Sequence, residues 1–575
     1  MTVEVWAPRA ERVRLHRPGR DDVELTGGLD GWFRGDVALA AGDEYGFLLG
    51  DATVPRPDPR SRRQPNGVHG LSAVDDPGMF AWTDEAWTGR QLPGALVYEL
   101  HVGTFTPAGT LDAAIERLDH LAELGVSHVE LLPVNGFNGT HNWGYDGVAW
   151  YTVQEDYGGP AGYRRFVDAA HERGLAVVQD VVYNHLGPSG NYLPEFGPYL
   201  REGQSNTWGE LLNLGEPAVR EHILGSALMW LRDFHVDGLR LDAVHALRDD
   251  SGIHILSELS ERVDALSAHL GRPLSLIAES DLNDPVMITA REAGGHGLTA
   301  QWSDDWHHAV HVALTGETDG YYADFADPQA LPKVWNGGFF HDGSYSSFRG
   351  RDHGAPIPPE VPSWRLVTFA QDHDQIGNRA AGDRLSQTLS ADRLAVAAVL
   401  TLTSPGTPML FMGEEWGAST PWQFFTSHPE QWLAEGTAAG RRAEFARMGW
   451  DESLVPDPND PATFQRSKLD WSEKDGGDHA RLLALYRRLA WLRRERSDLT
   501  DPRPGARPAF AAGPGRWVLG RGRARVVVNL SAESWTQPWP LSDGGDVLWL
   551  ATRDAVIDDQ TLTLPPDSAA ILGPA

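Results

Sequence analysis

The chain has 575 residues, of which 41% are hydrophobic, so it is long enough for several domains and can bury a large core. Its 80 acidic residues outnumber 49 basic ones and leave a formal charge of -31. This charge argues against nucleic acid or an anionic membrane as a partner, but it does not disfavour a neutral ligand. The absence of cysteine excludes disulfides and thiolate metal sites, and it favours a reducing compartment.

Residues 1–88 predict a small β-sandwich, which we expect to be immunoglobulin-like and of the carbohydrate-binding type. Val5, Leu15 and Phe47 lie in short alternating runs between Gly and Asp turns, and no helical period appears. The chain enters this strand pattern at once, without a basic or apolar leader, so we see no signal peptide and expect a cytoplasmic protein. No apolar run is long enough to span a bilayer.

From residue 89 the pattern changes to buried-type strands that alternate with amphipathic helices. We expect strands at 96–100, 128–132, 175–182, 238–241, 274–278, 298–302, 365–370 and 408–412. We expect helices at 110–124, 163–173, 219–234, 255–270, 307–314 and 392–402. Such repeated alternation is typical of a (β/α)8 TIM barrel. A doubly wound open sheet is the alternative, and it is less favoured because no Gly-rich phosphate turn is present.

The predicted fold class is therefore α/β, a TIM barrel flanked by an N-terminal and a C-terminal β-sandwich. The barrel domain should cover residues 89–497 and be closed by a helix at 479–494. Two long segments should lie on its functional face: an excursion at 183–217 after the third strand, and a loop at 414–468 after the eighth. Residues 498–575, with short strands between Gly, Asp and Pro turns, predict the second sandwich.

The stretch from Gly238 to His245 contains a short strand that ends at Asp242. Arg240, two residues earlier, would keep this aspartate charged and orient it. Taken alone, the pattern favours an aspartate that caps the next helix, with Arg240 as its structural ion pair.

Polar clusters follow four of the predicted strands, at 180–185, 240–242, 279–281 and 372–375. TIM barrels carry their chemistry at the carboxyl ends of the strands. Each cluster alone could be an ion pair or a cap, but four at one end of a barrel are hard to explain in that way. A carboxylate pair on adjacent strands suits acid and base catalysis at a glycosidic bond.

Two other kinds of enzyme fit less well. A metal site could use His185, Asp242 and Glu279, but no compact HxH or HExxH spacing supports it. A Ser-His-Asp hydrolase would need a GxSxG turn, which we do not find. We therefore expect neither a metal nor a cofactor.

The four clusters, in this order, resemble the signature regions of the α-amylase family of glycoside hydrolases and transglycosylases, and the resemblance covers residues 89–495. It implies that Asp242 is the nucleophile, Glu279 the general acid/base and Asp374 the stabiliser of the transition state. It also implies that four side chains hold the sugar at the cleavage point: Tyr145, His185, Arg240 and His373. Some members of the family bind a structural calcium, for which only Asn184 suggests itself as a ligand.

These roles set requirements on the two central carboxyl groups. Glu279 must hold a proton at neutral pH, and the apolar residues 276–278 and the charge of Asp242 should both raise its pKa. Retention of configuration needs the two groups roughly 5 Å apart, which adjacent strands can provide.

Stretches outside the catalytic regions are similar to the maltooligosyltrehalose trehalohydrolases within this family: 58–70, 301–308, 314–317, 320–322, 371–378 and 413–417. This similarity implies hydrolysis of the α-1,4 bond next to the trehalose end of maltooligosyl trehalose, a neutral oligosaccharide. It also implies a functional pairing with a maltooligosyl trehalose synthase. Ser303 and Asp372 depart from the pattern, since we expect asparagine at both positions.

The leaving side must bind an α,α-1,1-linked pair of glucoses, which is kinked relative to amylose. Four polar residues are hypothesised to face it: His245, Asp304, Asp305 and Gln375. The alternatives are a glycogen branching enzyme, which transfers to a glucan hydroxyl, and a glucan-binding scaffold without activity. The three predicted catalytic carboxylates make the scaffold the weaker of the two.

Overall fold

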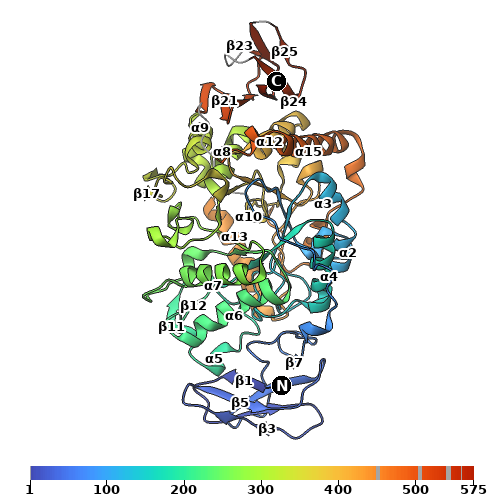
Figure 1. The fold of residues 1–575 in the computed structure, drawn as a ribbon, viewed down its shortest axis with the longest axis vertical. Coiled ribbons are helices and arrows are strands. Elements are labelled where there is room, and N and C mark those ends of the chain that lie inside the picture. Colours follow the sequence, from blue (N-terminus) through green and yellow to red (C-terminus); the bar gives the residue numbers. More distant parts are fainter. Residues whose placement is uncertain (1, 449–453, 503–507, 539–544, 559) are drawn as a thin grey trace.

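The computed structural model describes residues 2–448, 454–502, 508–538, 545–558 and 560–575, and its centre is a closed barrel of eight parallel strands (Figure 1). The strands are β8 (Val97–Leu100), β9 (His128–Leu131), β10 (Ala176–Val181), β13 (Gly238–Leu241), β14 (Ser275–Ala278), β15 (Ala300–Trp302), β18 (Leu366–Thr368) and β19 (Thr407–Phe411). The last strand pairs with the first, so the barrel prediction is confirmed and the open sheet is excluded.

Helices follow the strands and cover the barrel. They include α2 (Leu111–Ile115), α3 (Leu118–Leu124), α4 (Gly159–Glu172), α6 (Pro217–Asp233), α7 (Ile255–Leu270), α8 (Asp304–Thr315), α12 (Ala391–Thr403) and α15 (Gly477–Glu495). The helix predicted at 110–124 is two helices. Leu111 and Leu118 are buried with helical spacing on both sides of the break, so the hydrophobic pattern does not reveal it.

The loops at the carboxyl ends contain more structure than the sequence predicted. The excursion after β10 holds α5 (Leu193–Phe196) and a hairpin of β11 (Leu200–Ser205) and β12 (Glu210–Leu212). The segment after α8 adds α9 (Ala330–Gly337) and a hairpin of β16 (Ser344–Ser346) and β17 (Arg351–His353). The loop after β19 contains α13 (Gln431–Met448) and α14 (Pro461–Arg466). The α13 sequence is rich in Ala, Glu and Arg, which favour helix without giving it an apolar face.

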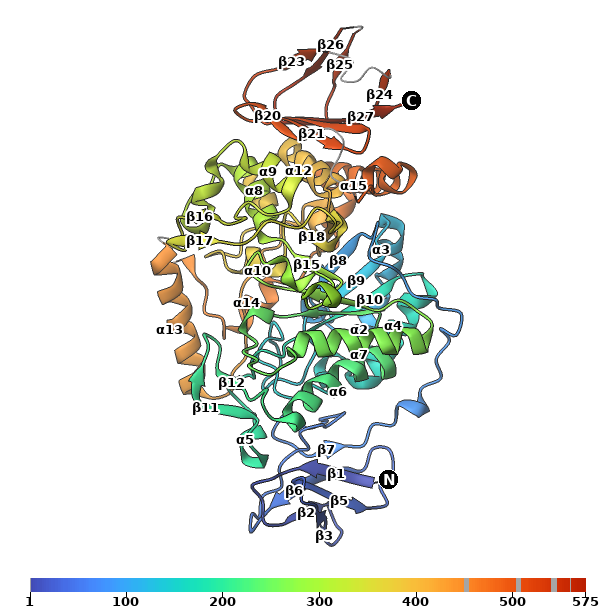
Figure 2. The same cartoon turned by 60° about the vertical axis from the view of Figure 1, so that its left-hand side comes forward.

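A strand-rich region lies at each end of the molecule, with the barrel between them (Figure 2). The N-terminal region has two sheets, with the strand orders β1-β5-β4 and β3-β2-β6-β7. Its strands are β1 (Thr2–Trp6), β2 (Val13–His16), β3 (Val23–Glu24), β4 (Thr26–Gly27), β5 (Trp32–Asp36), β6 (Glu44–Leu49) and β7 (Ser72–Ala73). The C-terminal region also has two sheets, with the strand orders β20-β21-β22-β27-β24 and β23-β26-β25. Its strands are β20 (Phe510–Gly513), β21 (Arg516–Arg521), β22 (Ala524–Asn529), β23 (Trp535–Pro538), β24 (Asp546–Ala551), β25 (Val556–Ile557), β26 (Thr561–Leu564) and β27 (Ser568–Pro574).

Both end regions contact the barrel domain through aromatic and charged side chains. The Trp6 ring lies 5.1 Å from that of Tyr199 in the excursion after β10. At the other end, Trp335 Nε1 donates to the Gly520 carbonyl at 2.8 Å, and Arg393 pairs with Asp567 at 2.9 Å. Among the described residues, every helix is too short or too polar to cross a membrane.

Candidate active site

A single buried guanidinium joins three carboxylates at the carboxyl end of the barrel. Arg240, on β13, is 1% exposed. Its Nη1 donates to Asp180 Oδ2 and to Asp242 Oδ1, each at 2.8 Å. Its Nη2 lies 3.0 Å from Glu279 Oε2. The charge of Arg240 therefore holds Asp242 and Glu279 side by side, as the order of strands β13 and β14 predicts.

Asp242 does not cap a helix. The short 3-10 helix that follows begins after Ala243 and has no side-chain cap. The second oxygen of Asp242 instead accepts a hydrogen bond from Asn184 Nδ2 at 2.6 Å. The alternative interpretation of this aspartate as a helix cap is therefore wrong, and its two oxygens are oriented by Arg240 on β13 and by Asn184 in the segment after β10.

The Asn184 side chain links Asp242 to His185. Its amide nitrogen donates to Asp242, and its Oδ1 lies 2.7 Å from His185 Nδ1. The other nitrogen of His185 lies 2.9 Å from the Tyr145 carbonyl. No group of three His, Asp or Glu side chains that could hold a metal occurs among the residues that the structure describes. Asn184 is therefore placed to orient Asp242 and His185.

Glu279 follows β14 and is 23% exposed at its side chain. Burial raises its pKa to about 8, and the charges of Asp242 and Asp374 act in the same direction while Arg240 opposes them. The raised pKa agrees with the prediction from the sequence. At neutral pH Glu279 is therefore protonated, as a general acid must be.

His373 is held as a cation by Glu99, a residue that the sequence analysis missed. His373 Nδ1 lies 2.5 Å from Glu99 Oε1, and its Nε2 lies 2.9 Å from the Tyr145 hydroxyl. This hydroxyl donates its one proton to Asp180 Oδ2 at 2.7 Å, so it accepts from His373, and both ring nitrogens carry protons. Burial lowers the pKa of His373, but the charge of Glu99 outweighs it and raises the pKa to about 10. The signal in the sequence was a charged residue inside an apolar strand.

Asp374 stands at the start of α10 (His373–Gly377), across the barrel from Asp242. Its Oδ1 accepts a hydrogen bond from Asn378 Nδ2 at 2.6 Å. The charge of Asp374 raises the pKa of Glu279, which places the two carboxyl groups in one electrostatic environment. The structure thus brings together the three predicted catalytic carboxylates.

Asp304 begins α8 and is partly exposed. Burial and the nearby charge of Asp374 raise its pKa to about 7. Asp304 therefore lies beside the predicted catalytic carboxylates, on the side where α8 begins. Gln375 turns to another neighbour, because its Oε1 is 3.5 Å from the Tyr321 hydroxyl.

Asp305 does not lie as the sequence predicted. It is buried, and its Oδ2 accepts hydrogen bonds from Asn283 Nδ2 and from the backbone amides of Phe340 and His341, at 2.7, 2.7 and 2.8 Å. The expectation that this carboxylate faces a ligand is wrong, because the chain's own donors occupy it. Asp305 instead joins the segments after β14 and α9.

His245 lies beside Asp281, from the predicted cluster at 279–281, and beside Trp208, which the sequence did not indicate. Its Nδ1 is 3.8 Å from Asp281 Oδ1, whose other oxygen accepts from Arg349 at 3.1 Å. The ring of Trp208, which is 48% exposed, lies 6.1 Å from His245 and 6.1 Å from His185. An exposed tryptophan in a tight turn beside the carboxylates provides a flat face on which a sugar ring can stack.

The comparisons with known proteins agree with this geometry. The model of the alpha amylase catalytic domain matches residues 77–208, and that of a domain of unknown function matches residues 504–571. The malto-oligosyltrehalose trehalohydrolase of Rhizobium sp. (strain M-11) is 57% identical, over 99% of this chain and 97% of its own length. That of Arthrobacter ramosus is 60% identical over 92% of both chains. The chain belongs to the malto-oligosyltrehalose trehalohydrolase family.

Solved structures agree with the observed fold. A crystal structure described as an alpha amylase from Salmonella typhimurium has a TM-score of 0.90, with 38% identity, and covers 100% of this trehalohydrolase-family chain and 97% of its own. The pullulanase of Anoxybacillus sp. LM18-11, solved with maltotetraose, has a TM-score of 0.72 at 19% identity, over 100% and 86% of the two chains. At that identity the likeness shows the fold alone.

The two residues that depart from the expected trehalohydrolase pattern both cap helices. Ser303 caps α8, because its Oγ accepts the Trp306 amide at 3.4 Å. Asp372 caps α10 in the same way through the Gln375 amide at 2.7 Å. Burial and the charge of Glu99 raise the pKa of Asp372 well above its usual value.

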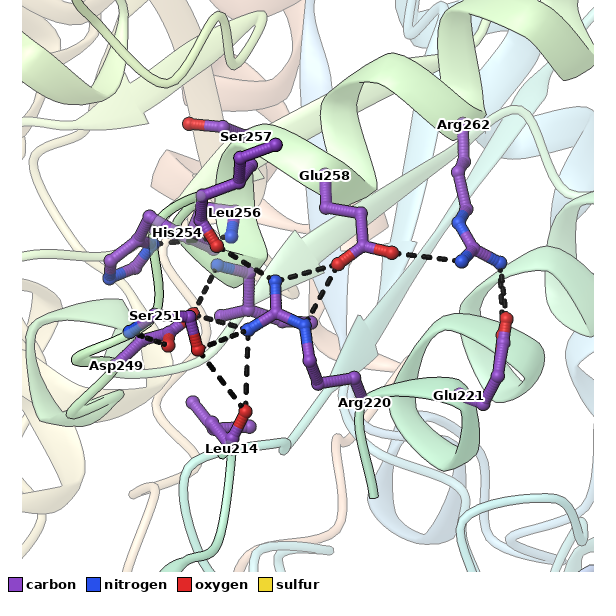
Figure 3. A network of polar contacts seen from close by, with 12 residues as sticks. Leu214, Arg220, Glu221, Asp249, Ser251, His254, Leu256, Ser257, Glu258 and Arg262 are labelled. Atoms are coloured by element: carbon purple, nitrogen blue, oxygen red, sulfur yellow. Dashed lines mark hydrogen bonds and ion pairs between the residues drawn. The ribbon is translucent and has the colours of Figure 1, made fainter. Parts of the chain in front are cut away.

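A polar network behind the site fixes the segment that carries His245 (Figure 3). Arg220, on α6, donates to Asp249 Oδ2 at 2.7 Å and to Glu258 Oε2 at 2.6 Å. It also donates to the Ile253 carbonyl at 2.9 Å. These contacts tie the connection from β13 to α7 onto α6, so the path of the chain after Asp242 is set by a residue outside the site.

Proposed function

We propose that the chain is a retaining glycoside hydrolase that cleaves the α-1,4 bond next to the trehalose end of maltooligosyl trehalose and releases trehalose. The observation that carries the chemistry is that Asp242 and Glu279 share the Arg240 guanidinium while Glu279 keeps its proton. A shared guanidinium keeps the two carboxyl groups close, and retention needs a separation of roughly 5 Å. The near full-length trehalohydrolase relatives support the substrate.

In the first step, Asp242 attacks the anomeric carbon while Glu279 gives its proton to the glycosidic oxygen. The C–O bond breaks, trehalose leaves with the proton, and the glucan stays bound to Asp242 as an ester. Asp374 lies where it can accept hydrogen bonds from ring hydroxyls as positive charge develops. His373, Tyr145 and the other predicted sugar-binding residues support the same ring.

In the second step, water replaces trehalose. Glu279, now ionised, takes a proton from that water, whose oxygen attacks the anomeric carbon and displaces Asp242. The products are a maltooligosaccharide of retained configuration and the regenerated protonated Glu279. Arg240 stabilises the negative charge that moves between Asp242 and Glu279 during the two steps.

The test of this proposal is to supply maltotriosyl trehalose and maltopentaose separately and to identify the products. We expect free trehalose and maltotriose from the first substrate and much slower attack on the second. Asp242→Asn should abolish both activities while the protein remains folded. Equal turnover of the two substrates would reject the assigned specificity, and full turnover by Asp242→Asn would reject the mechanism.

A branching enzyme is the second candidate, because one from Xanthomonas euvesicatoria pv. vesicatoria is 32% identical over 53% of this chain. Branching transfers the glucan to another glucan hydroxyl instead of to water. Amylose stained with iodine should then change colour without release of reducing sugar. We expect amylose to show neither a rapid colour change nor rapid release of reducing sugar, because it has no trehalose end.

We further propose that the protein acts in the cytoplasm, in trehalose biosynthesis from α-glucans, after a maltooligosyl trehalose synthase. The substrate must be supplied by an enzyme that converts the reducing end of a glucan into an α,α-1,1 linkage. The lack of cysteine is compatible with a reducing compartment. Fractionation of cells and assay of trehalose from starch with and without each enzyme would test both points.

A further inference from the structure

The residue after the proposed nucleophile has an unfavourable backbone conformation. Ala243 has φ 41° and ψ 51°, in the left-handed region that residues with a Cβ seldom adopt. Ala243 is buried, and it follows Asp242 directly. Strain of this kind persists only where the surrounding contacts enforce it, and it is common where a group must be aimed.

The left-handed conformation aims two successive amides at Glu279. The Ala243 amide donates to Glu279 Oε2 at 2.7 Å, and the Val244 amide donates to the Glu279 carbonyl oxygen at 3.0 Å. Arg240 Nη2 approaches the same Oε2 at 3.0 Å. One oxygen of the Glu279 carboxyl group therefore faces two donors that are fixed in place.

This arrangement distinguishes the two oxygens of Glu279. A protonated carboxyl group has one O–H and one carbonyl oxygen. Because Oε2 faces two donors, it must be the acceptor, and the proton must lie on Oε1. Among the described residues Oε1 has no hydrogen-bond partner, and the side chain is partly exposed, so Oε1 is the oxygen that can reach a ligand.

We propose that the Ala243 backbone amide is a positioning group that makes Oε1 of Glu279 the oxygen that gives and takes the proton. The left-handed turn at Ala243 lets this amide and the next one both face Glu279. The inference rests on the proposed function, in which Glu279 is the general acid/base. Before the first step the amide holds the carboxyl plane, and after proton donation it stabilises the charge left on Oε2.

The experiment replaces single amides by esters in the full-length protein. Introducing the hydroxy-acid analogue of alanine at position 243 removes this N–H and leaves the side chain unchanged. A hydrogen bond to the charged form of a carboxyl group lowers its pKa, so its loss should raise the pKa of Glu279. We expect the basic limb of kcat/KM against pH, measured with maltotriosyl trehalose, to move upward by about one pH unit.

The matched control is the hydroxy-acid analogue of valine at position 244. It removes a backbone hydrogen bond of similar length to the same residue, but to its carbonyl oxygen and not to its carboxyl group. A shift of the basic limb in the 243 ester alone supports the proposal. If the basic limbs of the two ester proteins fall at the same pH, the proposal is overturned. If the wild-type enzyme releases no trehalose, the proposed function is overturned instead.

A second measurement needs no folded ester variant. In protein labelled with 15N-alanine, the amide proton of Ala243 should titrate with the same midpoint as the basic limb. Ala243→Gly removes this one cross peak and so identifies it. An Ala243 amide whose shift is constant through that pH range overturns the proposal, even if neither ester protein can be made.

Discussion

At the scale of single residues, the protonation of the site is set by burial against neighbouring charges. Glu99 and His373 form a buried pair, and Arg240 faces three carboxylates at once. Burial keeps Glu279 protonated. The site therefore holds the Arg240-paired Asp242 beside a protonated Glu279, and retaining glycosidases likewise use two neighbouring carboxyl groups.

The first prediction concerns the pH dependence of kcat/KM on maltotriosyl trehalose. Glu279 must be protonated to donate, so activity should fall as the pH rises through its pKa of about 8. The mid-point of this basic limb is read from initial rates at low substrate concentration, with unfolding monitored by circular dichroism at each pH. Activity that stays constant well above that pH, in a folded protein, would show that another group is the acid.

The second prediction separates two adjacent aspartates. Asp305→Ala should reduce turnover of maltotriosyl trehalose and maltopentaose by equal factors and lower stability by about 1–3 kcal/mol, because its carboxylate binds backbone amides. Asp304→Ala should reduce trehalose release about tenfold more than maltopentaose cleavage, because Asp304 is the partly exposed one. Parallel assays on both substrates check this. Selective loss in Asp305→Ala alone would restore the role first expected for that residue.

At the scale of elements, the segments after the barrel strands determine the site, and they are fixed by contacts from behind. The connection from β13 to α7 carries His245, yet Arg220 on α6 sets its course. The carboxylate of Asp249 in that connection is fully buried. Burial alone would raise the pKa of Asp249, but hydrogen bonds from Ser251, Arg220 and Ile255 outweigh it and lower this pKa to about 2.

The third prediction compares two arginines that contact the same carboxylate, Glu258 (Figure 3). Arg220→Met should destabilise the protein by about 3 kcal/mol and raise KM, because Asp249 is left buried without its counter-charge. Arg262→Met should cost less than about 1 kcal/mol, because Arg262 is 38% exposed. Urea unfolding and Michaelis kinetics of both variants test this. Equal effects in the two variants would contradict it.

At the scale of the whole molecule, the chain between the N-terminal sandwich and the barrel is clamped to the amino-terminal side of the barrel. His171 on α4 is buried between Asp84 and Asp237, at 2.8 and 2.9 Å. Trp87 donates to Asp237 at 2.8 Å. Burial lowers the pKa of His171, but the hydrogen bonds and charges of the two aspartates raise it overall. Burial alone would raise the pKa values of Asp84 and Asp237, but the same contacts outweigh it and lower both pKa values.

The fourth prediction follows from these shifts. The raised pKa of His171 gives stability that is fully present below its ordinary value of 6.5 and is lost as the pH rises through the folded value. The lowered pKa of Asp237 gives stability that is lost as the pH falls below 3.8. His171→Gln should therefore cost about 3 kcal/mol between these limits and less at higher pH.

Melting temperatures of wild type and His171→Gln across this pH range measure the effect. His269→Gln is the control, because His269 is exposed near the end of α7. A difference in melting temperature that does not decline with rising pH would show that the clamp acts through packing and not through charge.

The sequence alone determined the barrel and its catalytic strand ends. Hydrophobic periodicity is a local property, so strands and helices could be found in order, and the polar clusters after four buried strands could be assigned to one face. Asp242, Glu279 and Asp374 were found in this way. The helix α13 was missed because it lacks an apolar face.

Only the tertiary structure decided which groups touch. Glu99 and His373 are separated by 274 residues, and no local pattern relates them. Asp304 and Asp305 look alike in the sequence, yet backbone amides from a distant segment occupy only the second. The left-handed turn at Ala243 was likewise invisible, since alanine gives no signal for it. Contacts between distant strands depend on how the barrel closes, and closure is a property of the whole chain.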